Sequence, residues 1–331
     1  MTDSAALDPW LLEHLVCPRH GQGLRVTGDV LRCDSGDEFP IVDGIPVMVL
    51  NDTRQTLWVA DESLTLAEEY RSGKRPSPSA APAGGDGIDP DVQSLVSATC
   101  GYLYEPLIQR LKRYPIPELR LPDASGEALL DIGCGWGRWT IAAARKGYRA
   151  VGLDPALRHV LAARRVCRQL DVPTLFVVAD ARYLPFAPQT FDVTFSYSVL
   201  QHFSKPDVRT ALASIAKVLK ARGTCFIQMP NAFGVRSLYH QARRGFGEAH
   251  NFDVRYWTPR ELEATFESLV GESTLSVDGY FGLGIQANDL DMLPLHFQAV
   301  VRSSEALRKV AKKAPWMTNL ADSIYVTSTR P

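Results

Sequence analysis

Acidic residues and a glycine-rich turn follow consecutive strand-like runs of this sequence. The stretch "LLDIGCGWGRWT" is apolar at its start and then carries an acid and three alternate glycines, at Asp131, Gly133, Gly135 and Gly137. Arg138 stands where the dinucleotide pattern G-x-G-x-x-G requires its third glycine, which argues against a nicotinamide cofactor. An acid beside such a turn favours a ligand that carries a cationic amino group.

Two further acids close the next two apolar runs. Asp154 ends "VGLD", where a carboxylate can accept both ribose hydroxyls of a nucleoside. Asp180 ends "FVVAD", where it can accept from an exocyclic adenine amine while the backbone N–H of Ala181 donates to a ring nitrogen. Three acids at successive strand ends therefore predict one nucleoside ligand.

Alternating strand-like and helix-like segments position these acids. Apolar, β-prone runs lie at 128–132, 150–153, 175–179, 191–197 and 225–229, and helix-compatible stretches lie at 138–146, 156–170 and 206–221. This alternation predicts an α/β fold with right-handed crossovers and a parallel sheet covered by helices on both faces. Ligands of such sheets bind beyond the carboxyl ends of the strands, so the acids and the glycine turn belong to one site.

The motifs "LLDIGCGWGRWT", "VGLDPA", "ADARYLPF" and "FDVTFSYSVLQHF" together resemble the class I S-adenosylmethionine-dependent methyltransferases, of the methyltransferase type 11 kind. The resemblance covers roughly residues 95–331. It implies a Rossmann-like, seven-stranded, mostly parallel sheet, with "DSIYVTST" near the C-terminus as an antiparallel strand beside the fifth. It also implies S-adenosyl-L-methionine as the cofactor.

The resemblance assigns site residues by position. Those expected to bind the cofactor are Asp131, Gly133, Cys134, Gly135, Trp136, Gly137, Asp154, Pro155, Asp180, Ala181, Ser196 and Tyr197. His202 and Tyr197 are the catalytic candidates, because "SYSVLQHF" follows the fourth strand and overlooks the transferred methyl group. An imidazole with a pKa near neutrality can accept a proton from a hydroxyl acceptor. A histidine that only packs beneath the cofactor is the alternative.

A separate unit precedes this domain. The stretch from Trp10, which ends "FPIVDGIPVMVL", resembles the small zinc-ribbon-like activators of tRNA methyltransferases and predicts two β-hairpins. Its ligand frame is degenerate: Cys17, His20 and Cys33 remain, but Gly36 stands where a fourth ligand is needed. A structural zinc site requires four ligands, so Asp34 or Asp37 would have to replace the missing one. We expect instead a unit without zinc that its β-strands hold together.

Composition divides the chain and limits its partners. We predict a zinc-ribbon-like unit at 1–50, a helical segment with a Pro/Gly/Ser-rich linker at 51–94, and the transferase domain at 95–331. Six dispersed cysteines, no basic and apolar leader and no run long enough to span a membrane predict a cytoplasmic protein. The sequence carries no indication of oligomeric state.

The net charge of −1 does not favour nucleic acid as a partner, so we expect a small-molecule or glycan-like acceptor, methylated on oxygen or nitrogen. Two alternatives stay open. The first is an RNA methyltransferase, suggested by the ribbon-like unit and by basic residues near the C-terminus, at Arg302, Arg308, Lys309, Lys312 and Lys313. The second is a cofactor-binding partner protein without chemistry of its own.

Overall fold

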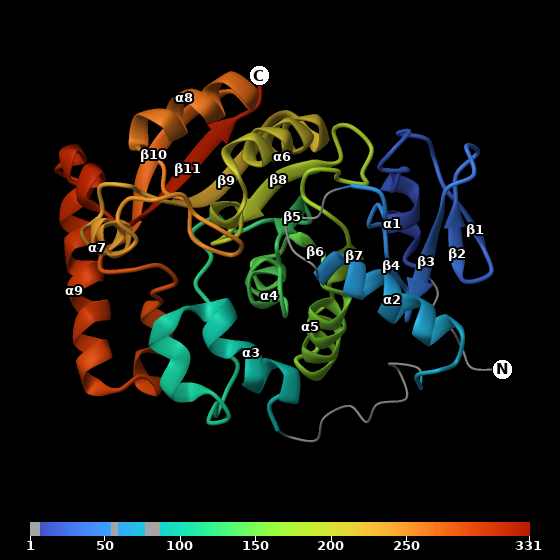
Figure 1. The fold of residues 1–331 in the computed structure, drawn as a ribbon, viewed down its shortest axis with the longest axis horizontal. Helices are drawn as coiled ribbons and strands as arrows, with labels where there is room; N and C mark the ends of the chain where they lie inside the picture. Colours follow the sequence, from blue (N-terminus) through green and yellow to red (C-terminus); the bar gives the residue numbers. More distant parts are fainter. Residues whose placement is uncertain (1–6, 54–58, 77–86) are drawn as a thin grey trace.

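The computed structural model describes residues 7–53, 59–76 and 87–331. Part of the predicted linker, at 77–86, lies outside these residues, as do the first six residues of the chain. The described chain forms one large mixed sheet with helices on both faces, and a smaller β-rich unit lies at one edge of it (Figure 1).

Seven strands form the large sheet in the order β10-β11-β9-β8-β5-β6-β7. Their bounds are Ala128–Ile132 (β5), Arg149–Asp154 (β6), Leu175–Val178 (β7), Phe191–Ser196 (β8), Leu219–Pro230 (β9), Glu272–Gly279 (β10) and Ser323–Thr329 (β11). β5 pairs in parallel with β6 and β8, β6 with β7, and β8 with β9, whereas β11 is antiparallel to both β9 and β10. This order confirms the predicted Rossmann-like sheet, including the antiparallel last strand beside the fifth.

Helices cover both faces of this sheet. On one face lie α6 (Lys205–Val218) and α8 (Pro259–Leu269), and on the other α3 (Pro90–Cys100), α4 (Arg138–Arg145) and α5 (Leu157–Gln169). Outside these layers are α2 (Val59–Arg71), α7 (Val235–Arg243) and α9 (Leu295–Ala311). Short 3-10 helices occupy Tyr102–Leu107 (η2), Leu200–His202 (η3), Ala287–Met292 (η4) and Pro315–Leu320 (η5).

Local signals explain several helix boundaries. Thr258 and Glu261 form a reciprocal capping box at the start of α8, which satisfies two backbone donors. The predicted helix 206–221 ends earlier, at Val218, because Leu219 is extended and pairs with Phe191 of β8. Tertiary pairing thus determines where this helix ends.

The N-terminal unit contains α1 (Pro9–His14) and a four-stranded sheet of β1 (Arg25–Thr27), β2 (Val30–Arg32), β3 (Glu38–Val42) and β4 (Ile45–Pro46). β1 pairs with β2 and β3 with β4, both antiparallel, which confirms the two predicted hairpins. The likeness of this unit to the activator family stays a prediction.

The unit joins the large sheet at β7, its edge strand. Val47 forms a parallel bridge with Val178, and the Met48 N–H donates to the Val178 carbonyl at 2.6 Å. Leu11, Leu15 and other side chains of the unit belong to the same apolar core as Phe186 and Phe191 of the large domain. The edge of β7 is therefore covered rather than open to another chain.

Candidate functional site

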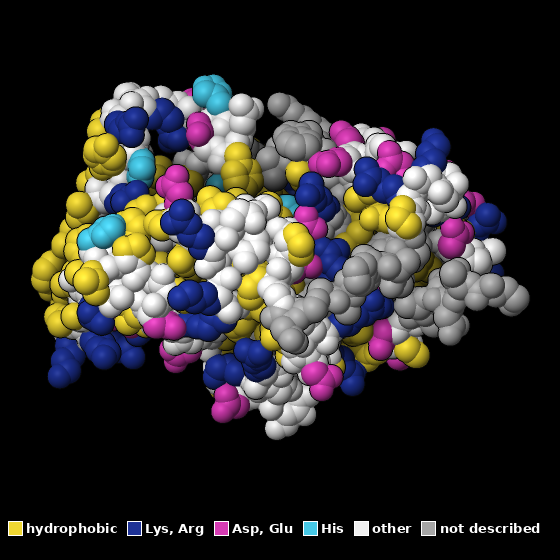
Figure 2. Space-filling model, turned by 90° about the horizontal axis from the view of Figure 1, so that it is seen from below, with side chains coloured by type: hydrophobic (Ala, Val, Ile, Leu, Met, Phe, Trp, Pro, Cys, Tyr) yellow, Lys and Arg dark blue, Asp and Glu magenta, His cyan; other side chains and the backbone are white. Residues whose placement is uncertain are grey.

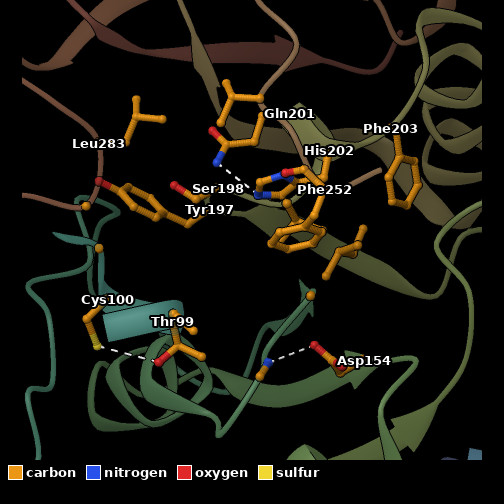
Figure 3. Close-up of a pocket in the computed structure, with 18 of the residues that line it drawn as sticks. Thr99, Cys100, Asp154, Tyr197, Ser198, Gln201, His202, Phe203, Phe252 and Leu283 are labelled. Atoms are coloured by element: carbon orange, nitrogen blue, oxygen red, sulfur yellow. Dashed lines mark hydrogen bonds between the residues drawn. The ribbon is translucent and has the colours of Figure 1, made fainter. Parts of the chain in front are cut away.

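A cavity of about 1050 Å³ lies at the carboxyl end of the parallel strands. It is lined by the turns after β5, β6, β7 and β8 and by parts of α2, α3 and α7. Figure 3 shows Asp154 and Thr99 on one side of the space and Tyr197, Gln201, His202 and Phe252 on the other. This is the location that the sequence analysis predicted for the ligand.

The glycine turn needs its glycines for conformation and for space. Gly133, Gly135 and Gly137 have φ values of 77°, 53° and 84°, which lie in the left-handed region. A Cβ at Gly133 would also overlap the Val199 side chain. The Gly133 N–H donates to the Leu153 carbonyl at 2.7 Å, which ties the turn to β6. The backbone can therefore approach a ligand closely.

Asp154 is held rigidly at the end of β6. Its carboxylate accepts the Gly135 N–H and the Ala156 N–H, each at 2.9 Å. The side chain nevertheless lines the cavity, as Pro155 does. A carboxylate fixed by two backbone donors keeps further lone pairs for hydroxyl groups of a ligand.

Asp180 and Ala181 line the cavity after β7. The Asp180 carboxylate accepts from the Arg182 side chain at 2.6 Å and from the Arg182 N–H at 2.9 Å. No local pattern in the sequence indicates this partner. Arg182 neutralises the acid, and the predicted contact of Asp180 with an adenine amine stays a prediction.

Three predicted cofactor residues lie behind the cavity wall, since Asp131, Gly137 and Ser196 are not among its lining residues. The Asp131 carboxylate accepts from the Thr140 hydroxyl at 2.6 Å, and burial raises its pKa to about 7. The Ser196 hydroxyl donates to the Ile132 carbonyl and so links β8 to β5. The other predicted turn residues, Gly133, Cys134, Gly135 and Trp136, do line the cavity.

His202 lines the cavity from η3, after β8. Its Nδ1 lies 2.7 Å from the Phe252 carbonyl, which only accepts, so Nδ1 carries the proton and Nε2 keeps its lone pair. Gln201 Nε2 donates to that Nε2 at 3.1 Å, and the imidazole stacks on the Phe252 ring. Burial lowers the pKa of His202 to about 4, so the ring is neutral at physiological pH.

Tyr197 also lines the cavity, but its hydroxyl is engaged elsewhere. It donates to Asp278 at 2.7 Å, and burial raises the pKa of the phenol well above its usual value. Asp278 also accepts from Ser323 and pairs with Arg120. This network fixes the Tyr197 ring in the wall, and its predicted catalytic role stays a prediction.

Some lining residues gave no signal in the sequence. Thr99, whose hydroxyl accepts from Trp136 Nε1 at 3.0 Å, comes from α3, and Arg236 comes from α7. Neither helix contains a motif, and only folding brings them to the strand ends. Gln201 is 4% exposed, and within the described ranges its Oε1 atom has no hydrogen-bond partner.

The N-terminal unit gathers one set of metal-ligating side chains. The ligand atoms of Cys17, Cys33 and Asp37 lie within 4.8 Å of one another, and His20 Nε2 lies 3.1 Å from an Asp37 oxygen. The Cys17 thiol donates to Asp37 at 3.3 Å, and burial raises the pKa of Cys17 to about 11. The Cys17 thiol and the Asp37 carboxylate of this cluster are thus hydrogen-bonded to each other.

Charged side chains of both signs share one face of the molecule. Lys and Arg side chains are spread over the face shown in Figure 2, with Asp and Glu side chains between them. In the part of the chain that the structure describes, no helix combines the length and the apolar character needed to cross a membrane.

Part of the chain that lines this cavity is similar to known proteins. Residues 129–223 match the family model described as "Methyltransferase domain". A "Ubiquinone biosynthesis O-methyltransferase" of Rhizobium rhizogenes is 30% identical over 158 residues, which are 46% of this chain and 60% of that protein. The "O-methyltransferase cnsE" of Penicillium expansum is 37% identical over 105 residues, which are 31% of this chain and 37% of that protein.

The chain thus spans less than two thirds of the length of either relative. A solved structure of an S-adenosylmethionine-dependent methyltransferase from Methanosarcina mazei aligns with 66% of this chain and 99% of its own, at 17% identity and a TM-score of 0.47. The fold assignment rests on the strand order rather than on this alignment. Residues 129–223 are thus similar to a methyltransferase domain, in agreement with the resemblance that the sequence motifs indicated.

Proposed function

We propose that this chain transfers a methyl group from S-adenosylmethionine to an oxygen atom of a small molecule. One observation carries the proposal: a single cavity is lined by the glycine turn, by Asp154 and by Asp180, which come from the ends of three neighbouring strands. These groups suit the parts of the cofactor in that order, with the amino-acid end at the turn, ribose at Asp154 and adenine at Asp180 and Ala181.

The residues around the cavity fit this cofactor. The left-handed turn leaves room for the ligand, and Asp154 is already oriented for a pair of hydroxyl groups. When bound, the cofactor supplies an electrophilic methyl group on a sulfonium. The protein's task is then to hold the acceptor oxygen in line with that methyl group, which supplies a large part of the rate.

His202 is the group that we propose for the proton of an un-ionised hydroxyl acceptor. Its Nε2 has the unprotonated lone pair that a base needs, and the low pKa keeps that nitrogen unprotonated at neutral pH. In the absence of an acceptor this lone pair accepts from Gln201 Nε2, and the hydroxyl of the acceptor would take the place of that donor. A base with a pKa of about 4 drives proton transfer only weakly, so the role suits an acidic hydroxyl such as a phenol. The alternative role, packing beside the cofactor, is supported by the stacking on Phe252.

The names of the relatives favour oxygen over nitrogen as the accepting atom. A glycan-like acceptor, the finer sequence prediction, rests on the absence of a basic excess and has no support from these names. We place the reaction in the cytoplasm, because the six cysteines are all free and buried, as expected for reduced thiols. The boundaries 1–50, 51–94 and 95–331 remain our division of the chain.

The proposal is tested by incubating the protein with cofactor labelled in its methyl group and with separate small-molecule and RNA fractions of a cell extract. We expect label in a small molecule, in a bond that has the stability of an ether or ester rather than of an N-methyl group. Label in RNA would support the RNA alternative instead. Cofactor binding without transfer to either fraction would support the non-catalytic alternative.

A further inference from the structure

The most unusual polar group of the cavity is the Arg138 guanidinium, at the first residue of α4. The side chain is 4% exposed and lines the cavity. Its Nε and Nη2 atoms are buried and have no hydrogen-bond partner among the described residues. A buried cation with unsatisfied N–H groups is strongly unfavourable unless an anion pairs with it.

The neighbours of Arg138 do not supply that anion. Asp289, the acid that acts on Arg138 through its charge, accepts from the Tyr104 hydroxyl and pairs with Arg113 at 3.4 Å. Within the described residues no carboxylate lies within 4.0 Å of the Arg138 nitrogens. The Cys100 thiol beside the guanidinium stays protonated, because burial raises its pKa.

Aromatic faces hold the cation in place. The guanidinium carbon lies 5.8 Å from the centre of the Tyr104 ring and 5.6 Å from the centre of the Trp139 ring. These contacts stabilise the charge and restrict its position, but they leave the N–H groups unpaired. Among the described residues, no acceptor with negative charge therefore pairs with the Nε and Nη2 atoms of Arg138.

We propose that Arg138 binds the carboxylate at the amino-acid end of the cofactor. This inference rests on the proposed function, and the sheet order supplies the direction. Asp180 follows β7 and Asp154 follows β6, so a nucleoside bound to both lies on one side of β5. Arg138 follows β5, and its charge interacts with Tyr197 after β8, on the other side. A ligand that begins at β7 and crosses β6 therefore ends near Arg138.

The chemistry of the two groups matches. A carboxylate only accepts hydrogen bonds, and its two oxygens fit the planar fork of a guanidinium. Lysine offers the charge without the fork. The sequence analysis treated Arg138 only as the residue that breaks the dinucleotide pattern, whereas the structure places its guanidinium at the cavity.

The test compares two ligands by calorimetry: S-adenosylhomocysteine and its decarboxylated analogue, which lacks only the carboxylate. Wild-type protein should bind the complete ligand about 10- to 100-fold more tightly, the range expected for a hydrogen-bonded charge pair. Arg138→Met should remove this preference, and Arg138→Lys should keep part of it. Arg145→Met, an exposed arginine at the other end of the same helix, is the matched control and should keep it in full.

Binding of 5′-methylthioadenosine, which has no amino-acid end, reports whether each variant retains the nucleoside site. Equal affinity of wild-type protein for the two ligands would overturn the proposal without any variant. The proposal would also be overturned if Arg138→Met and Arg138→Lys lowered the affinity for the complete and the decarboxylated ligand by the same factor. Arg138 would then have a structural role. Full ligand preference in Arg138→Met with reduced methyl transfer would assign Arg138 to the acceptor instead. Failure of wild-type protein to bind any of the three ligands would contradict the proposed function itself.

Discussion

His202 combines an unprotonated Nε2, which accepts from Gln201, with a pKa that burial lowers to about 4. The residue is already deprotonated over the whole neutral range, so its own titration cannot limit methyl transfer there. A histidine at an exposed site would instead titrate near its usual pKa of about 6.5. The burial of one ring thus changes the expected pH dependence of the reaction.

If His202 Nε2 accepts the acceptor proton, His202→Ala should lower turnover by about 10²- to 10⁴-fold and leave the affinity for S-adenosylhomocysteine nearly unchanged. The rate of wild-type protein should fall only as the pH approaches 4. His296→Ala, an exposed histidine of α9, is the control and should have no effect. Full turnover and full affinity in His202→Ala would make His202 a packing residue.

Burial raises the pKa of Asp131, whereas it lowers the pKa of His202. The pKa of Asp131 is raised to about 7 in the folded protein, whereas a carboxyl in the unfolded chain has a pKa of about 4. The folded state therefore binds the proton more tightly, and this contribution to the free energy of unfolding is present at low pH and lost as the pH rises towards 7.

Asp131→Asn keeps an oxygen for the Thr140 hydroxyl and cannot ionise. Its free energy of unfolding, measured by urea denaturation without ligand, should therefore rise relative to wild type between about pH 4 and pH 7. A constant difference between the two proteins over this range would show that Asp131 does not titrate there.

At the scale of elements, the contact between the N-terminal unit and the large sheet is made at β7. This strand forms the edge of the large sheet, and the N-terminal unit covers it through Val47 and Met48. The same unit packs on Phe186 and Phe191. Among the described residues up to Thr53, none lines the cavity, so we expect this unit to act structurally.

A chain that begins at Val59, and so lacks the N-terminal unit but keeps α2, should therefore have a lower melting temperature and should associate through the uncovered edge. Size-exclusion chromatography and thermal unfolding measure these effects. A chain that lacks only residues 1–6 is the control and should behave as wild type. A shortened chain that is monomeric, equally stable and fully active would remove the structural role.

The cysteine cluster of the same unit leads to a separate prediction. Cys17, Cys33 and Asp37 provide three ligand atoms, and Asp37 already accepts from the Cys17 thiol and pairs with His20. Structural zinc requires four ligands, and among the described residues only these three have ligand atoms that all lie within 4.8 Å of one another. Elemental analysis should therefore find less than stoichiometric zinc, and a chelator should leave the melting temperature unchanged. One zinc per chain would contradict this prediction.

Sequence reasoning worked best where one element determines the result. The positions of Asp154 and Asp180 were predictable, because an apolar run indicates a buried parallel strand and an acid that closes the run then lies at the carboxyl edge of the sheet. The early end of α6 was not, since it depends on the pairing of Leu219 with Phe191. Arg182 at Asp180, Asp278 at Tyr197 and Arg138 at the cavity are tertiary contacts that no local pattern encodes.

At the scale of the whole molecule, the cavity combines segments that are far apart in the chain. Ala60 of α2, Thr99 of α3, Gly135 of the turn, His202 of η3 and Arg236 of α7 all line it. The strand ends supply the part of the cavity that the motifs identify, and the helices around the sheet supply further lining residues. The central claim, that this cavity binds S-adenosylmethionine through Asp154, concerns the first part.

Calorimetric titration with S-adenosylhomocysteine tests that claim most directly, in wild-type protein, in Asp154→Asn and in Asp171→Asn. Asp171 is an exposed acid after α5, so its variant makes the same change of charge away from the cavity. Loss of the charged contacts to ribose should weaken binding by about 2 to 4 kcal/mol in Asp154→Asn and not in Asp171→Asn. The same affinity in all three proteins, or no binding to wild-type protein, would contradict the account.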